Sequence, residues 1–381
     1  MCVRTPEPHS GDMEVTNTQP RKGENGKRVF SDMAEPKSSE KKENIMKTKL
    51  IPYLGLALLG LALSATQAAA QLQWSPAQSY DTGQDTAIAM HPSGLVLEFH
   101  RTHVYGGLTL WYRVGRVEGN TVTWGRSQGL PGSGTWPNVA ITREGYVLYV
   151  WSTYAYKTNS NLKYMVGKID PNGDVNQSIT WLTYEQRFDS GFHSSTVVND
   201  NGVIVEVHES GSGGKGLYYR VGHLADPATG NFNIVWNSGN YGQHYDDGIN
   251  PDIALNNRNE VVEVHQVTGE ALLHYHRGVV LSGGVIDFRP AQRYDNNGGR
   301  PAVALTDSGL VAALSGSGAI YARTGALSLS NLNVIDWSSF NKISDTGTYP
   351  AVATNGSFAV GTWTEYFGLE GELYFSVAKI P

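Results

Sequence analysis

The chain has 381 residues, of which 40% are hydrophobic and 17% are charged, and it contains 44 glycines, 9 tryptophans and a single cysteine. This composition excludes a disordered chain, a collagen-like repeat and a disulfide scaffold, and with Cys2 as the one thiol it excludes a thiolate metal site after residue 70. Residues 71–381 carry 19 basic and 27 acidic residues, and this net charge of −8 argues against a nucleic-acid partner.

The segment before Gln71 predicts a secretion signal rather than a folded domain. Residues 46–70 combine a basic start, an apolar run from Leu50 to Leu63 and an Ala-x-Ala exit, which are the parts of a secretory signal peptide. A membrane anchor needs about 20 apolar residues, and this run is shorter and contains Pro52. Residues 1–45 are polar, so we expect a disordered or mis-assigned extension before a true start at Met46. The mature protein, residues 71–381, is then secreted or periplasmic and has no membrane span.

From residue 71 onward the sequence contains six copies of one unit. A Tyr-Asp-x-Gly motif, with Phe in place of Tyr in the third copy, is complete in copies one, three and four and degraded in the others. The motif glycines are almost evenly spaced, and each interval is long enough for four short strands and their turns. The glycines that mark copies one to six are Gly83, Gly134, Gly191, Gly248, Gly298 and Gly347.

The strands of one unit are clearest in copy three. Residues 195–198, 203–208, 217–221 and 234–236 show period-two alternation, with β-branched and aromatic residues inside and Gly or Asn at the breaks. No amphipathic helix is predicted in residues 71–381. The fourth strand carries an aromatic residue in every full copy: Trp124, Trp181, Trp236, Phe288 and Trp337.

The two ends of the repeat region share one unit. The sixth copy stops after its third strand, and the missing fourth strand is found at the other end of the chain, in residues 71–79 around Trp74. An open solenoid has no reason to divide one unit between its ends, whereas a closed ring does, because closure removes exposed strand edges. The sequence therefore predicts an all-β fold, a six-bladed β-propeller of four-stranded antiparallel blades closed by the N-terminal strand.

Candidate site residues recur at the end of the second strand. Copies one, three and four have Glu-x-His there, and residues two apart point to the same side of a strand. In the antiparallel hairpin of copy three Glu206 lies opposite Arg220, which places His208 opposite Tyr218. The same register applies to copy one. The candidate ligand-binding residues are Glu98, His100, Trp111, Arg113, Glu206, His208, Tyr218, Arg220, Glu263 and His265.

These sets have two explanations. As a sugar site, Arg and Glu bind vicinal hydroxyls while Trp or Tyr offers a flat face to a pyranose ring. As a structural device, Glu and Arg form a cross-strand ion pair and His bonds a carbonyl or the motif Asp. Catalysis by copy-four acids is a third possibility, with Asp246, Asp247, Asp252 and Glu263 as candidates.

Metal binding is not predicted. The alternating Asp/Asn spacing of a calcium loop is absent from the acidic stretch of copy four. His193, His244, His274 and His276 fit no standard zinc spacing, and the last two are expected on a surface-facing polar strand opposite Glu263 and His265. No cofactor is expected.

The sets resemble those of the secreted bacterial six-bladed fucose-binding lectins, whose sites between blades use an Arg, a Glu and a Trp or Tyr. The matching residue types are Arg113, Glu98 and Trp111 in copy one, and Arg220, Glu206 and Tyr218 in copy three. A weaker resemblance is to the sialidases, because residues 79–83 match the first five positions of their Ser-x-Asp-x-Gly-x-Thr-Trp turn. Residues 84–86 depart from it, and no spacing identifies the three arginines that a sialidase needs.

The sequence as a whole predicts a secreted propeller that binds glycans at repeated sites without transforming them. Repeated weak sites on a rigid ring give avidity for a glycan-coated surface. The alternatives are a glycoside hydrolase or sialidase-like enzyme, and a scaffold for a protein partner.

Overall fold

A computed structural model describes residues 70–104, 107–153, 160–211, 214–237, 239, 241–367 and 370–381. In these ranges the regular structure is β-strand apart from one 3₁₀ turn, Pro227–Thr229. No helix among them has the length and apolarity to cross a bilayer. The predicted extension (1–45) and all but the last residue of the predicted signal peptide (46–70) lie outside the described residues.

The strands follow one another with short connections, as the alternating pattern predicts. In the first half of the chain they are β1 (Gln78–Thr82), β2 (Gln84–Met90), β3 (Leu95–Val104), β4 (Gly107–Glu118), β5 (Thr121–Trp124), β6 (Gln128–Ser133), β7 (Thr135–Ile141), β8 (Tyr146–Ser152), β9 (Asn161–Lys168), β10 (Thr180–Trp181), β11 (Gln186–Val198), β12 (Ile204–Ser210) and β13 (Gly216–Asp226). In the second half they are β14 (Asn231–Trp236), β15 (Gln243–Asp247), β16 (Ile249–Leu255), β17 (Glu260–Gln266), β18 (Leu273–Val280), β19 (Ile286–Phe288), β20 (Gln292–Asp295), β21 (Ala302–Leu305), β22 (Leu310–Leu327), β23 (Ile335–Trp337), β24 (Asn341–Thr354), β25 (Phe358–Phe367) and β26 (Glu370–Lys379).

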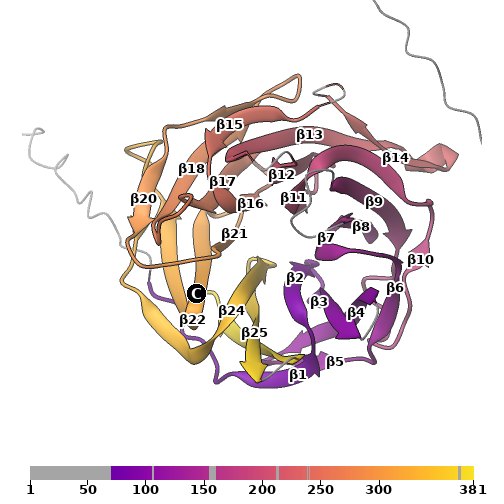
Figure 1. Ribbon diagram of the computed structural model, residues 1–381, viewed down its shortest axis with the longest axis horizontal. Helices are drawn as coiled ribbons and strands as arrows, with labels where there is room; N and C mark the ends of the chain where they lie inside the picture. Colours follow the sequence, from indigo (N-terminus) through magenta and orange to yellow (C-terminus); the bar gives the residue numbers. More distant parts are fainter. Residues whose placement is uncertain are drawn as a thin grey trace, which may run out of the picture. The chain divides into compact units, whose positions relative to one another are not determined.

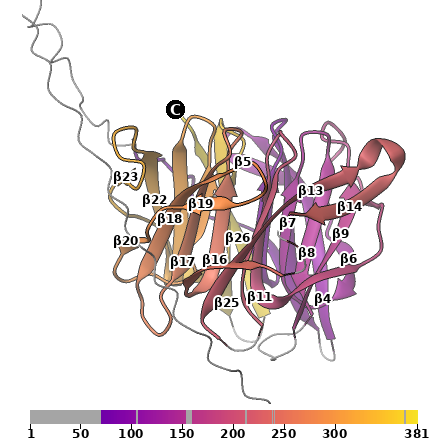
Figure 2. The ribbon, with the colours of Figure 1, turned by 90° about the horizontal axis from the view of Figure 1, so that it is seen from above.

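The sheets stand around a common centre (Figure 1), and their strands run across the thickness of the unit in the side view (Figure 2). Strands β2, β7, β11, β16, β21 and β24 lie nearest the centre, and every pairing of named strands is antiparallel. The predicted registers are confirmed: Glu206 pairs with Arg220 and His208 with Tyr218, and copy one has the same arrangement.

The outer edge of each sheet differs from the prediction. The Tyr-Asp-x-Gly segments, read from the sequence as turns, form strands that pair with the third strand of the preceding copy. They are the short strands β1, β15 and β20 in copies one, four and five, and the first part of the long strands β11 and β24 in copies three and six. Thus β13 of copy three pairs with β14 over one half and with β15 over the other. The outermost strand of a sheet is therefore made of two pieces, one from its own copy and one from the next.

The first described residues complete an edge in the same way. Trp74 bridges Ala378 of β26, and the backbone N–H of Ser75 donates to the carbonyl of Val377 at 2.8 Å. Strand β1 pairs with the same β26. The first and the last described segments of the chain are thus hydrogen-bonded along one edge.

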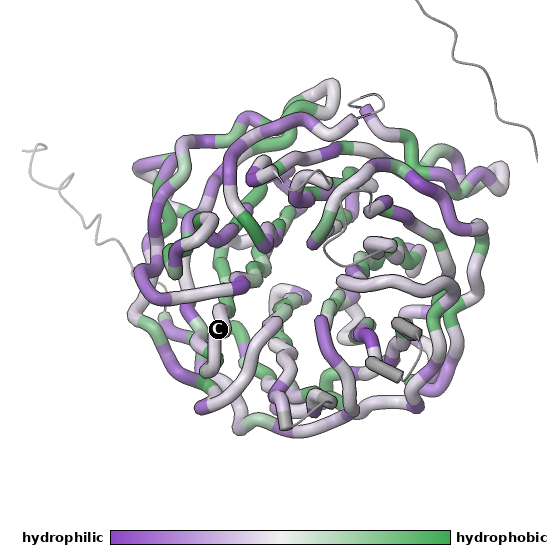
Figure 3. Tube along the Cα trace, in the orientation of Figure 1, coloured by the Kyte–Doolittle hydropathy of each residue, from purple (hydrophilic) through white to green (hydrophobic). Residues whose placement is uncertain are grey.

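The hydrophobic core of the described residues divides into six clusters, each shared by two consecutive copies or by the last and the first. One of them joins Phe99 of copy one to Tyr149 and Trp151 of copy two. In Figure 3 the hydrophobic stretches lie within the wall that the strands build. Apolar side chains on both faces of a sheet fit sheets that pack against a neighbour on each side.

A hydrogen bond from one sheet to the next repeats along these contacts. Tyr164 of β9 accepts a bond from the backbone N–H of Ile234 at 3.1 Å and donates to Gln186 at 3.0 Å. The pairs Tyr112 with Ile179, Tyr219 with Ile286 and Tyr275 with Ile335 repeat the first bond at 3.1 to 3.3 Å. Each bond satisfies a buried backbone donor that its own sheet leaves unpaired.

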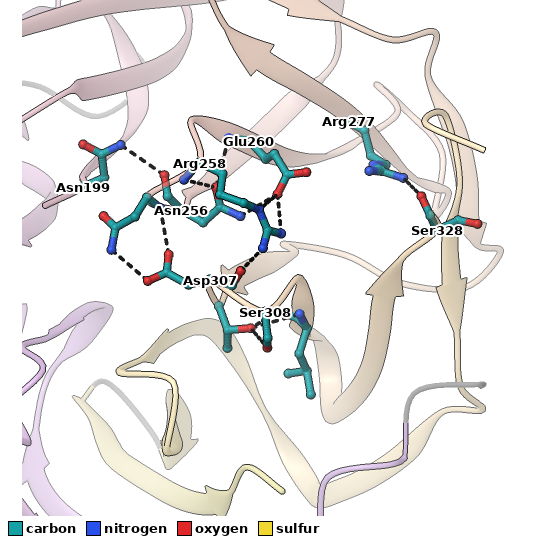
Figure 4. Close-up of polar contacts among 11 residues, drawn as sticks. Asn199, Asn256, Arg258, Glu260, Arg277, Asp307, Ser308 and Ser328 are labelled. Carbon is teal, nitrogen blue, oxygen red and sulfur yellow. Dashed lines mark hydrogen bonds and ion pairs between the residues drawn. The ribbon is translucent and has the colours of Figure 1, made fainter. Parts of the chain in front are cut away.

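The turns between the first and second strands of copies three, four and five are hydrogen-bonded to one another (Figure 4). Asn199 donates to the carbonyl of Asn256 at 3.1 Å. The amide of Asn257 donates to Asp307 at 2.8 Å, and Arg258 pairs with Glu260 at 2.6 Å. Asparagine and aspartate suit these positions because their side chains satisfy backbone groups in tight turns.

The tyrosine bond between sheets yields a stability prediction. Tyr164→Phe removes the acceptor of the Ile234 N–H and leaves that buried donor without a partner, so we expect the free energy of unfolding to fall by about 1–3 kcal/mol. Urea denaturation measures the change. Tyr184→Phe is the matched control, since Tyr184 is 92% exposed and its replacement leaves stability unchanged. Equal stability of the two variants would contradict the assignment.

Candidate functional site

The predicted Glu-x-His pairs lie inside the protein. The carboxylates of Glu98, Glu206 and Glu263 are fully buried, and their histidines are 1–2% exposed. In each copy the histidine Nδ1 bonds the carboxylate two residues earlier, at 2.9 Å in copy one, 3.0 Å in copy three and 3.1 Å in copy four. A buried imidazole is thus held by a buried carboxylate in all three copies.

The motif Asp faces the other side of the imidazole. In copy one the Nε2 of His100 lies 3.9 Å from Asp81, which also binds the guanidinium of Arg113 at 2.5 Å. In copy three Arg220 reaches Asp189 at 3.4 Å. The arginines therefore pair with the motif Asp, which reaches them from the outer edge of the preceding sheet, rather than with the Glu opposite them.

The motif glycine explains why the two motifs occur together. A Cβ atom built on Gly83 would lie 2.7 Å from the Cδ2 atom of His100, and one on Gly191 would lie 2.6 Å from that of His208. Real Cβ atoms do not approach so closely. In copy two, where Trp151 takes the place of the His, Gly134 meets its indole ring at the same distance of 2.6 Å. Glycine is needed wherever a large ring is seated under the strand.

The aromatic members of the predicted sets are partly exposed. Trp111 and Tyr218 both lie near the surface, and the Tyr218 ring stacks on His208 with 5.8 Å between centroids. A cavity of about 500 Å³ opens beside this stack, and Asn161, Arg187, Asp189, His208, Tyr218 and Tyr241 are among its lining residues. The structure brings the copy-three residues to a cavity, and their ligand-binding role stays a prediction.

A second pocket, of about 240 Å³, lies at the centre and is lined by the innermost strand of every copy. One end of it is formed by the residues that stand two positions after the motif glycines. They are Asp85, Trp136, His193, Asn250, Arg300 and Tyr349, called here the axial ring. Six unlike side chains, one from each copy, thus meet around one pocket.

The backbone of the axial ring is unusual. All six residues have a φ between 44° and 54°, the left-handed region that favours glycine. Asparagine and aspartate tolerate this conformation, but Trp, His, Arg and Tyr adopt it only at a cost of order 1–3 kcal/mol. Such cost concentrated at equivalent positions around a pocket is typical of a functional site.

Side chains of the second strands hold the axial ring in place. Asp85 pairs with Arg101 at 2.5 Å, and His193 pairs with Glu209 at 2.6 Å. Glu209 also accepts the backbone N–H of Asn250 at 2.5 Å. Two aromatic members pack against charged or polar neighbours: the Trp136 ring lies 3.9 Å from that of His193, and the guanidinium of Arg300 lies 3.5 Å from the centre of the Tyr349 ring.

The pKa values of Asp85 and Glu209, the two carboxyls next to His193, are shifted in opposite directions. Burial raises the pKa of Asp85, although Arg101, His193 and Arg300 oppose the rise. Burial also acts on Glu209, but there His193 and the Asn250 N–H prevail and lower its pKa. The pKa of Asp85 is thus raised and that of Glu209 is lowered, and His193 acts on both carboxyls.

The sequence analysis missed the axial ring. Its signal is positional, an offset of two residues from the motif glycine, and four of the six residues are followed by proline. The residue types differ from copy to copy, so a search for recurring residues passes over them. The pattern that locates the axial ring is a recurring backbone conformation.

The copy-four acids do not gather in one catalytic group. Asp247 is exposed and contacts His244, whereas Asp252 lies on the wall of the central pocket. Glu263 and Asp246 contact His265 from its two sides. One expectation is corrected here: His276 does not face the surface but is 5% exposed and bonded to Asp246, which satisfies it inside the protein.

Neither the family models nor the curated proteins contain a match to this sequence. Solved structures do match. A protein of unknown function from Dyadobacter fermentans has a TM-score of 0.54 at 10% identity, over 81% of this chain and 99% of its own. The GH93 α-L-arabinofuranosidase of Fusarium graminearum has a TM-score of 0.51 at 10% identity, covering 79% and 98%. Trypanosoma rangeli sialidase has 0.50 at 9%, covering 78% of this chain and 55% of its own. These likenesses show the fold, which is that of a β-propeller.

Asp252, on the wall of the central pocket, makes the stability of the protein depend on pH. Burial raises its pKa from 3.8 to about 7, against the hydrogen bonds from Ser195 and from the N–H of Val303. Between these two pH values the folded protein keeps a proton that the unfolded chain releases, so its stability falls as the pH rises from about 4 to about 7.

Urea denaturation across this pH range tests the assignment. Asp252→Asn cannot titrate, and we expect the stability of the wild type relative to this variant to fall by at least about 1 kcal/mol over the range, since one pKa unit corresponds to about 1.4 kcal/mol. Parallel pH profiles for the two proteins would show that the carboxyl is ordinary.

Proposed function

We propose that this protein is a secreted carbohydrate-binding propeller that recognises a glycan at the axial ring. The observation that carries the proposal is the strained conformation shared by six unlike side chains around one pocket. Glycan-acting enzymes with the same fold, an arabinofuranosidase and a sialidase among them, support a carbohydrate ligand.

The chemistry of the axial ring suits a sugar. Trp136 and Tyr349 supply flat apolar faces of the kind that pack on a pyranose ring. Arg300 and Asn250 supply donors, while Asp85 supplies acceptors, as hydroxyl groups require. A small number of polar groups converging with aromatic rings on a concave site is the usual composition of a small-molecule pocket.

The seams between copies are the second place where we propose glycan contact, as the lectin resemblance implies. The cavity beside His208 and Tyr218 supports this, because Arg187, Asn161 and Tyr241 offer polar groups and a second aromatic ring there. The buried Glu206 does not contact the sugar in this proposal, but accepts a hydrogen bond from the Nδ1 atom of His208 and so orients its imidazole. The sugar's own contacts are with Tyr218 and the other lining residues.

We propose further that the ring has six blades and is closed by the N-terminal strand. The six core clusters, one of which joins Ile88 of copy one to Val360 of copy six, support this arrangement, as does the pairing of Trp74 with Ala378. Secretion through the signal peptide in residues 46–70 belongs to the same proposal.

A glycan array followed by titration of the retained glycan tests the binding proposal. We expect Trp136→Ala to weaken binding about tenfold or more, equivalent to about 1.4 kcal/mol, because a stacking face is lost. Tyr218→Ala tests the seam cavity in the same assay, and Tyr184→Ala is the control at an exposed aromatic. A glycan whose binding survives both Trp136→Ala and Tyr218→Ala, or an array without retained glycans, would overturn the proposal.

Glycoside hydrolysis is the second candidate, and the contrasting pKa shifts of Asp85 and Glu209 favour it. An acid and a base of this kind are what the reaction needs. Under the binding proposal the wild type releases no reducing sugar from the glycans that it retains. Release that falls about a hundredfold in Asp85→Asn and Glu209→Gln, but not in Asp247→Asn, would replace binding with hydrolysis.

A further inference from the structure

We infer that Asp246, His265 and His276 bind a divalent metal ion of the Zn²⁺ class. One donor atom from each of these residues lies within 4.8 Å of the others. The Oδ2 atom of Asp246 is 2.7 Å from the Nε2 atom of His276 and 3.7 Å from that of His265. Ligands about 2.1 Å from a tetrahedral zinc ion are about 3.4 Å apart, a value between these two distances.

The outward nitrogens of both histidines are fixed by hydrogen bonds. The Nδ1 atom of His276 donates to the backbone carbonyl of Arg289 at 2.6 Å, and that of His265 donates to the carboxylate of Glu263 at 3.1 Å. In neutral imidazoles this leaves both Nε2 lone pairs facing Asp246. Zinc-binding histidines are oriented by the same kind of carbonyl and carboxylate partner.

Three electron-rich atoms in one place require a positive charge, which is either a proton on one imidazole or a metal ion. Two imidazole lone pairs and a carboxylate oxygen repel one another unless a positive charge lies between them. The ordinary solution is seen in copies one and three, where Arg113 and Arg220 bring a guanidinium to the motif Asp. Copy four has His276 at the position of those arginines, since it pairs with Glu263 in the same register. The fixed cation is thus replaced by a metal ligand.

The site is rigid and open on one side. His265 and His276 lie on the paired strands β17 and β18, Asp246 lies on β15 at the edge of the preceding sheet, and both histidines are buried. The side chain of Asp246 is 31% exposed, which gives an ion a path from the solvent. Three protein ligands leave the fourth tetrahedral position for a water molecule. This site is separate in composition from the axial ring, so it stands whatever the proposed function turns out to be.

Titration of the full chain, purified without a polyhistidine tag and treated with EDTA, tests the inference. Calorimetry with Zn²⁺ is expected to show one ion per chain, and Co²⁺ is expected to give the visible absorption of a tetrahedral ion. Glu263→Gln is expected to weaken Zn²⁺ binding about 10- to 100-fold by loosening His265.

His276→Arg is the decisive variant, because it gives copy four the arrangement of copies one and three. It is expected to fold as the wild type does and to lose the Zn²⁺ site. His274→Ala, which changes a histidine beside His265 but outside the group, is expected to keep it. If His276→Arg does not fold, His276→Gln replaces it in the same titration. Absence of one-to-one Zn²⁺ binding in the wild type, or binding that survives the His276 change, would show that a proton on His276 supplies the charge.

Discussion

The seating of a buried ring beneath a glycine is the contact on which the other features depend. His208 packs against Gly191 and is hydrogen-bonded to Glu206. This contact fixes the position of β11, the innermost strand of the same copy, at Gly191. Two residues further on stands His193, in a left-handed conformation at the central pocket. Where the ring is an indole, as with Trp151 beneath Gly134, the same contact positions Trp136. In the copies that have this contact, the interior of the sheet thus determines where the axial-ring side chain is presented.

Much of this arrangement was predictable because it follows from periodicity. Alternating strands and the pairing of Glu206 with Arg220 come directly from residue spacing, and both are found. Partner choice was not predictable, since Arg220 prefers Asp189, which belongs to a strand that sequence reasoning took for a turn. The axial ring escaped for another reason. The residue types of Arg300 and Tyr349 do not indicate a strained φ. What the six positions share is their constant offset from the motif glycine, and in four of them a following proline.

Charge placement distinguishes the copies more than shape does. Copies one, three and four keep the same backbone, the same Glu–His pair and the same Asp, and differ in what faces that Asp. An arginine closes the network with a permanent charge, whereas a histidine supplies that charge only when it is protonated or binds a metal ion. A repeat that keeps its frame can therefore vary its chemistry through one third-strand residue, as the six members of the axial ring vary at their own position.

The two-piece outer strand has a consequence for synthesis of the chain. Because β15 completes the edge of β13, copy three keeps an unpaired strand edge until the start of copy four has left the ribosome. Each copy in this way covers the exposed strand edge of the copy before it. The edge of the copy-six sheet, on β26, is completed by β1, which is made before the other named strands. That pairing joins Gln78 to Phe375 and closes the longest loop among the paired strands of the described residues, so we expect it to form late and to be a point at which neighbouring molecules exchange strands.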